Sequence, residues 1–136
     1  MLKIDFTNEM IFGFEGPNLC LLGTEDDFRN LSKAILPLTS AKSAHRVDVT
    51  ALPFVEIPGD KVKVVFSSGE GSCTFGHIID NTTVSFELDN RYWERIFVFF
   101  ALMSWDKKTF YLNSFEDYLR DLPLDQEVHF ICSSEF

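Results

Sequence analysis

The sequence predicts a single α+β domain over residues 1–136, with a mostly antiparallel sheet, two main helices packed on one face of it and a short third helix. Three observations point to this fold class. The 136 residues are 46% hydrophobic and include 15 Phe, which is enough apolar material for one core. Short segments in which polar and apolar residues alternate, as in half-buried strands, recur along the chain. Two longer segments repeat apolar residues at the spacing of a helix face.

The N-terminal residues predict strands. Residues 2–7 alternate strictly between apolar and polar side chains. Residues 10–14 and 19–22 are two further apolar segments, and the Glu-Gly-Pro-Asn cluster between them is typical of a turn. The chain should therefore open as an antiparallel meander.

A helix should follow this meander. Thr24 and Asp27 have the spacing of a capping box, in which the first side chain caps the helix and the second bonds back to the cap. The apolar stripe of the helix comprises Phe28, Leu31, Ile35 and Leu38. Pro37 disfavours helical backbone at the residue before it, so the helix should end near that point.

The middle of the chain predicts successive hairpins. Residues 45–51 alternate, and residues 54–57 and 61–67 flank a Pro-Gly turn. Residues 73–79 and 83–88 flank an Asp-Asn turn. We therefore expect strands that pair with their neighbours in sequence.

The most apolar segment, Asn90–Trp105, predicts the central helix. Asp89 or Asn90 can cap its first free N–H groups. Its core-facing stripe comprises Trp93, Ile96, Phe97, Phe100 and Met103. A membrane span needs about 20 apolar residues, so this shorter segment should be a core helix.

The other side of this helix is also apolar. It carries Tyr92, Phe99 and Leu102, where a solvated helix face would be polar. We expect either a second layer of the chain to cover these residues or a homodimer contact to do so.

The C-terminal third predicts a strand, a short helix and a last strand. Residues 109–112 are the first strand. Residues 114–122 begin with a second capping box and are stopped by Pro123, so they should form a helix of about two turns. Residues 128–132 alternate again as the last strand.

An internal match relates two parts of the chain. Residues 19–39 align without gaps to residues 84–104 at an offset of 65, and apolar and capping residues fall opposite their own kind. The match suggests a pseudo-twofold repeat of two strand–helix–strand halves that share one sheet.

Charge restricts the range of partners. The chain has 12 Lys and Arg against 21 Asp and Glu, a net charge of −9, and such a balance repels phosphate backbones and anionic lipids while attracting basic surfaces. Simple solubility is the other explanation for the acidity. We expect neither a nucleic acid nor a membrane as partner.

The number of cysteines and the N-terminal residues predict the cellular compartment. Three cysteines without close spacing do not indicate a disulfide framework. The first residues have no basic region followed by an apolar core, so we expect no signal peptide and a cytoplasmic location.

Candidate catalytic and metal sites are few. Cys73 and His77 lie four apart on a predicted strand, hence on one face, but a zinc site would need further ligands that the sequence does not place nearby. The segment Ser67–Ser72 contains two glycines, yet it lies between strands, whereas a phosphate cradle leads into a helix. The paired carboxylates lie on polar helix faces. We therefore expect no enzyme, no cofactor and no metal.

The segment 21–31, LLGTEDDFRNL, resembles the strand–G-[ST]-E-x-x-x-x-x-L helix pattern of several families of bacterial immunity proteins. These proteins bind and block toxins of contact-dependent inhibition and other polymorphic toxin systems. The resemblance implies a non-catalytic module that neutralises a cognate toxin, and a nuclease-type toxin would be basic. It assigns no functional residue to this chain.

The partner-binding residues are predicted from charge alone. The favoured patch is formed by acids on the short C-terminal helix and its exit, namely Glu116, Asp117, Asp121 and Asp125. Asp26 and Asp27 come second, because a helix N-terminus already uses part of their charge. Two alternatives remain open: a small homo-oligomeric adaptor, and a domain that binds a ligand or single-stranded nucleic acid on the open face of its sheet.

Overall fold

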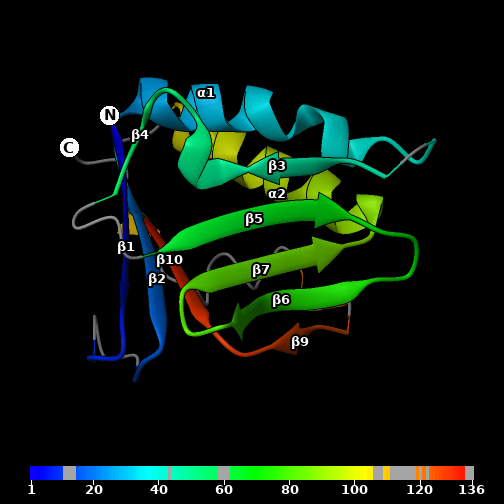
Figure 1. Ribbon diagram of the computed structural model, residues 1–136. Coiled ribbons are helices and arrows are strands. Elements are labelled where there is room, and N and C mark those ends of the chain that lie inside the picture. Colours follow the sequence, from blue (N-terminus) through cyan, green and yellow to red (C-terminus); the bar gives the residue numbers. More distant parts are fainter. Residues whose placement is uncertain are drawn as a thin grey trace.

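The computed structural model describes residues 1–10, 15–42, 44–57, 62–105, 109–110, 119, 121 and 123–133. These residues form an α+β fold with two α-helices and two five-stranded sheets. In Figure 1 the strands β1, β2 and β10 run upright, while β5, β6 and β7 run across them.

Each sheet combines strands from distant parts of the chain. In order across the first sheet, the strands are β4 (Val55–Glu56), β1 (Leu2–Thr7), β2 (Asn18–Leu22), β10 (His129–Ser133) and β8 (Thr109–Phe110). In order across the second sheet, they are β3 (Arg46–Asp48), β5 (Lys63–Ser68), β7 (Thr83–Leu88), β6 (Cys73–Ile79) and β9 (Asp125–Gln126).

Both sheets are mixed, so the prediction of one mostly antiparallel sheet is wrong. Across the first sheet, β4 and β1 are parallel, β1 and β2 antiparallel, β2 and β10 parallel, and β10 and β8 antiparallel. Across the second sheet, starting from β9, parallel and antiparallel pairs alternate in the same order. The strands form two sheets, so the expectation that both helices lie on one shared sheet is also wrong.

Only some of the expected hairpins form. The hairpin β6–β7 is confirmed, and Asp80 and Asn81 have φ values of 57° and 60°, as both central residues of a type I′ turn must. The hairpin expected around the Pro-Gly turn does not form, because β4 pairs with β1 and β5 pairs with β7. A turn signal reverses the chain locally, but it does not choose the partner of the strand that follows.

Several element boundaries also differ from the sequence prediction. The strand expected over 45–51 is shorter, because β3 ends at Asp48 and Val49–Ala51 is a 3-10 turn. Strand β9 was not expected. Of the strand expected over 10–14, Met10 is not in a strand and residues 11–14 lie outside the described residues. Of the short helix expected over 114–122, only Leu119 and Asp121 are described, and both lie in turns rather than in a helix. Leu119 is buried.

Both main helices begin where the sequence predicts. Helix α1 (Glu25–Ile35) has the complete capping box: the Asp27 N–H donates to the Thr24 hydroxyl, and the Thr24 N–H donates to the Asp27 carboxylate. A 3-10 helix (Leu36–Thr39) continues it past Pro37. Helix α2 (Asn90–Met103) is capped by Asp89.

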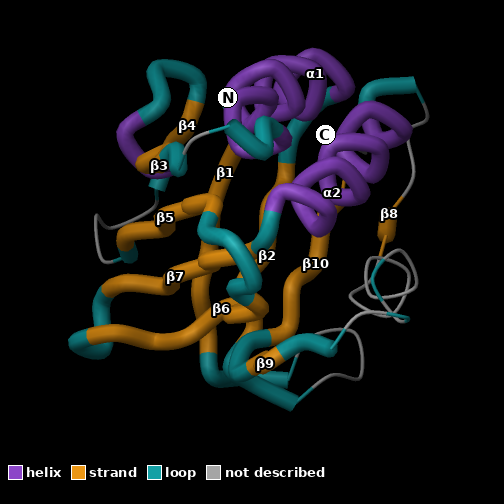
Figure 2. Tube along the Cα trace, turned by 90° about the vertical axis from the view of Figure 1, so that its right-hand side faces the viewer, coloured by secondary structure: helices purple, strands orange, loops and turns teal. Residues whose placement is uncertain are grey.

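The core lies between the two sheets and the two helices, which pack side by side (Figure 2). Phe130 of the first sheet meets Phe86 of the second with ring centroids 5.4 Å apart. Phe100 of α2 reaches both Phe130, at 6.4 Å, and Phe28 of α1, at 6.1 Å. Because one aromatic cluster joins all four parts, the described residues share a single core.

Candidate functional site

Asp121, from the favoured acidic patch, lies beside helix α2. Its carboxylate accepts two hydrogen bonds from the Arg95 guanidinium, one of them over 3.0 Å between Oδ2 and Nη2. These bonds lower the pKa of Asp121 and raise the pKa of Arg95. The exposed carboxylate therefore stays ionised, but an internal cation balances its charge.

Asp125 lies on the outer face of the second sheet. Its Oδ2 is 3.2 Å from His77 Nε2, and its backbone is in register with Thr74 of β6. Thr74 is in register on its other side with Glu87 of β7. Cross-strand neighbours share a face, so the exposed carboxylates Glu87 and Asp125 stand in one row with Thr74 between them. We call Glu87 and Asp125 the acidic row.

The remaining predicted acids differ in their roles. Asp26 is exposed and forms an ion pair with Arg29 one helical turn away. Asp27 is buried, and it serves the capping box and lies 3.5 Å from the N-terminal amine of Met1. Its carboxylate is therefore already used by the fold. Glu116 and Asp117 lie outside the described residues, so only Asp121 and Asp125 of the favoured patch can be placed.

The outward side of α2 differs from the expected one. Tyr92 and Phe99 are buried, and the Tyr92 hydroxyl donates to the Pro123 carbonyl over 3.0 Å, so the chain itself covers this side. Leu102 alone of the three predicted residues is exposed. It belongs to an exposed apolar stripe formed by Val98 (48% exposed) and Leu102 (45%) of α2 and by Trp105 (83%), which lies in the turn just after the helix. We call these three residues the α2 stripe.

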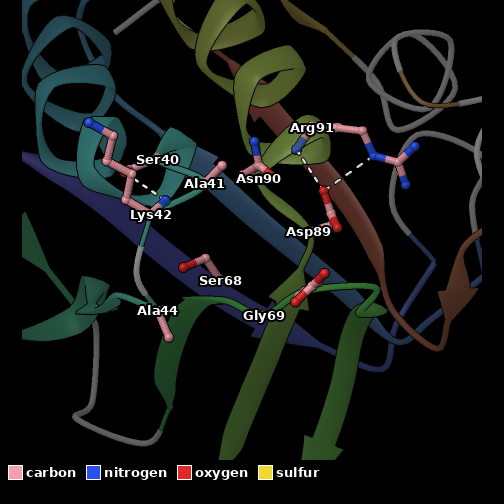
Figure 3. A pocket seen from close by; sticks show the side chains of 10 residues that line it. Ser40, Ala41, Lys42, Ala44, Ser68, Gly69, Asp89, Asn90 and Arg91 are labelled. Atoms are coloured by element: carbon pink, nitrogen blue, oxygen red, sulfur yellow. Dashed lines mark hydrogen bonds and ion pairs between the residues drawn. The ribbon is translucent and has the colours of Figure 1, made fainter.

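A hollow of about 540 Å³ opens at the N-terminus of α2 (Figure 3). It is lined by residues 40–42, 44, 68–70 and 89–91, which the fold brings together from three segments. Its charged side chains are of both signs, with Lys42 and Arg91 against Glu70 and Asp89. The lining therefore favours neither an anion nor a cation.

Asp89 at the edge of this hollow is committed to the fold. Its Oδ2 accepts from the Gly71 N–H over 2.9 Å, and its Oδ1 accepts from the Arg91 N–H over 3.1 Å and from the Arg91 Nε over 3.2 Å. These bonds lower the pKa of Asp89. One carboxylate thus caps α2 and fixes the turn between β5 and β6.

The expected Cys73–His77 pair is split between two faces. Gly76 has a φ of +72°, and the register of β6 against β7 shifts between Phe75 and His77. This bulge interrupts the alternation of side chains. Cys73 pairs with buried Leu88 and packs against the core, whereas His77 pairs with Ser85 and binds Asp125. The two side chains cannot act together.

The other two thiols are buried. Burial, together with the charge of Asp5, raises the pKa of Cys20 to about 11, and burial raises the pKa of Cys132 well above its usual range. Both stay protonated near neutral pH and are poor nucleophiles. Within the described ranges, no group of three or more His, Cys, Asp or Glu side chains could hold a metal ion.

Comparison with known proteins gave no match to a family model, a curated protein or a solved structure. Neither of the helices among the described residues has both the length and the apolar character needed to cross a membrane. The functional argument therefore starts from the surfaces of this chain: the acidic row, Asp121 and the α2 stripe. Sequence reasoning missed Glu87, Val98 and Trp105, although the helical spacing of 98, 102 and 105 could have indicated the stripe.

Proposed function

We propose that this chain is a non-catalytic protein-binding module, namely a cytoplasmic immunity protein that neutralises a basic, nuclease-type toxin. The resemblance of segment 21–31 to immunity proteins and the net charge of −9 both support this function. The buried carboxylates of Asp27 and Asp89 are both bonded in helix caps, and the carboxylates of Glu87 and Asp125 are exposed. A general acid needs a desolvated carboxyl that is free to exchange a proton, so this arrangement supports binding over catalysis.

The acidic row is the observation that carries the proposal. Glu87 and Asp125 are separated by one strand, so their backbones are about 10 Å apart at the usual spacing of neighbouring strands. Glu87 has no ion pair within the described part of the chain, so folding does not account for its charge. Two exposed carboxylates that come from distant parts of the sequence form a ready contact for a basic surface.

A basic partner follows from what a nuclease must do. A nuclease domain binds a polyanion and therefore presents Lys and Arg around its substrate groove. An acidic inhibitor that covers this groove competes with the substrate and is drawn to it over a distance. Steering of this kind raises the association rate and weakens as salt is added.

The test compares two doubly neutralised variants. Glu87→Gln with Asp125→Asn removes the acidic row, while Asp5→Asn with Glu56→Gln removes the same charge from exposed residues of the first sheet. Each would be mixed with a catalytically inactive form of the protein that the adjacent gene encodes, as the candidate toxin domain. We expect the first variant to associate about tenfold more slowly at low salt, with a flatter salt dependence, and the second to associate nearly as the wild type.

Two results would count against this function. If the wild-type chain neither binds that toxin domain nor protects cells that express the active form, the proposed function fails. If both variants lose association rate equally, net charge rather than the acidic row provides the steering.

We also propose that the chain is an internal repeat of two halves, residues 1–68 and 69–133. Each half runs strand, strand, helix and three strands, and both sheets show the same order of parallel and antiparallel pairs. The helix caps Thr24 and Asp89 are 65 residues apart, which is the offset of the sequence match. In this arrangement the halves exchange strands between two sheets instead of sharing one.

A further inference from the structure

The α2 stripe is an apolar surface that the core does not use. Val98, Leu102 and Trp105 are exposed, and none of them belongs to the buried cluster that unites the sheets and helices. The opposite side of the same helix provides Trp93, Ile96 and Phe100 to that cluster. Folding therefore accounts for one side of α2 and leaves the other unexplained.

In the proposed internal repeat, the matching positions of the first half carry no large apolar side chain. At the offset of 65, the counterparts of the stripe are Lys33, Pro37 and Ser40. The core positions Phe28, Leu31 and Ile35 of α1, in contrast, match the buried apolar residues Trp93, Ile96 and Phe100 of α2. The stripe is thus a property of α2 alone, as expected of a surface that serves a partner rather than the fold.

Acids border the stripe at its N-terminal end. Glu94 is exposed one helical turn before Val98, and no ion pair within the described ranges involves it. Asp121 is held beside the same turn by Arg95. Arg95 balances the charge of Asp121, so Glu94 provides the unbalanced negative charge at this end. An apolar strip that ends beside such a carboxylate matches a partner that has an apolar anchor next to a Lys or Arg side chain.

We propose that the α2 stripe is the docking site for the apolar anchor of the basic partner, an inference that rests on the proposed function. A second copy of this chain is the weaker occupant, because each copy carries a net charge of −9 and would bring the same acids to the contact. Trp105 is the central contact. An exposed Trp that becomes buried on binding is the residue type that most often dominates the energy of an interface.

The acidic row and the α2 stripe then have separable roles. Exposed charges act during the approach and set the association rate, whereas buried apolar contacts act once the complex has formed and set the dissociation rate. The docking proposal therefore predicts a change in a different rate constant from the one that the acidic row controls.

The experiment measures both rate constants by surface plasmon resonance, with an inactive form of the protein encoded by the adjacent gene, the candidate toxin domain, as the probe. Leu102→Ser with Trp105→Ser removes most of the α2 stripe. The matched control is Leu36→Ser, because Leu36 is 53% exposed and lies on the other half of the chain. Thermal unfolding checks that each variant keeps wild-type stability, as expected for exposed positions. We expect the double variant to dissociate at least about tenfold faster with little change in association, and the control to behave as the wild type.

The possible outcomes are distinct. A wild-type chain that does not bind the toxin domain overturns the proposed function. A complex that forms while the double variant dissociates at the wild-type rate overturns only the docking site. Sedimentation of the wild-type chain at high micromolar concentration tests the other occupant: a dimer that the double variant abolishes would assign the α2 stripe to a second copy, whereas a 15.6 kDa monomer supports the partner.

Discussion

Gly76 and Gly71 have the same backbone conformation, with φ of +72° at each, but different surroundings. A Cβ added at Gly71 would meet nothing within 4 Å. A Cβ added at Gly76 would lie 2.9 Å from the Cβ of Val128, an atom held close to its own backbone. Gly76 therefore meets two requirements, of conformation and of space, and the bulge in β6 depends on both.

Alanine at these two positions separates the requirements. Gly71→Ala should destabilise the fold by about 1–2 kcal/mol, the usual cost of the left-handed region for a residue with a side chain. Gly76→Ala should cost about 1–3 kcal/mol more, because Val128 has to move. Urea unfolding measures both variants, and equal losses would show that the contact with Val128 is relieved without cost.

Asp89 makes the stability of the fold dependent on pH. Its pKa in the folded chain lies below its ordinary value. Its contribution to the free energy of unfolding is therefore complete above about pH 3.9, the pKa of an Asp in the unfolded chain, and is lost as the pH falls through the lower pKa that Asp89 has in the folded chain. Asp89→Asn keeps an oxygen that can cap the helix but removes the charge, so it should lower the free energy of unfolding at pH 7 by about 1 kcal/mol, the difference between a hydrogen bond to a charged group and one to a neutral group. The gap between the variant and the wild type should close between about pH 5 and pH 2.

Asp26→Asn is the matched control for this measurement, because it removes one charge from an exposed position in the first turn of α1. It should leave the pH profile of unfolding close to that of the wild type. A constant gap between Asp89→Asn and the wild type across the acid range would mean that the carboxylate does not stabilise the fold through its charge.

At the scale of the element, helix α2 has two apolar sides with different roles. Phe100 is fully buried and faces Phe28, Phe99 and Phe130, whereas Val98 is about half exposed. The sequence shows both residues as apolar positions in one helix. Their packing assigns one of them to the core and the other to the surface.

Truncation of each residue tests this assignment. Phe100→Ala should cost about 3–5 kcal/mol, the usual range for a buried Phe in a core that collapses only partly. Val98→Ala should change the free energy of unfolding by less than about 0.5 kcal/mol, as for most surface substitutions. A loss under about 1 kcal/mol for Phe100→Ala in a denaturant titration would show that the core does not depend on α2.

At the scale of the whole molecule, neither half of the chain completes a sheet. The first sheet takes β1, β2 and β4 from the first half and β8 and β10 from the second. The second sheet takes β6, β7 and β9 from the second half and β3 and β5 from the first. Separation of the halves would therefore remove strands from both sheets at once.

Two fragments, residues 1–69 and 70–136, test this interdependence. Neither should fold as a monomer, and an equimolar mixture should recover the near-ultraviolet circular dichroism of the intact chain, because only together do they supply both sheets. A cooperative unfolding transition in a monomeric fragment would contradict the exchange of strands. A folded homodimer of the first fragment would support the proposed internal repeat, since a second copy could supply the missing strands.

Features that depend on neighbouring residues could be predicted from the amino-acid sequence. The capping box of Thr24 and Asp27, the start of α2 at Asp89 and the β6–β7 turn follow from side chains and backbone within four residues of one another. The buried stripes of both helices follow from their spacing of apolar residues. The acidity of the surface could also be predicted, from the amino-acid composition alone.

The pairing of the strands and the contacts between charges, in contrast, depend on how the whole chain packs. Every strand offers the same backbone donors and acceptors, so an alternating pattern does not identify its partner, and the parallel pairs β2–β10 and β5–β7 were not foreseen. The bulge at Gly76 separated Cys73 from His77, and the pairing of β6 with both β7 and β9 brought Glu87 into a row with Asp125. These contacts join residues far apart in the chain, where local propensity has no influence and the packing of the shared core selects the arrangement.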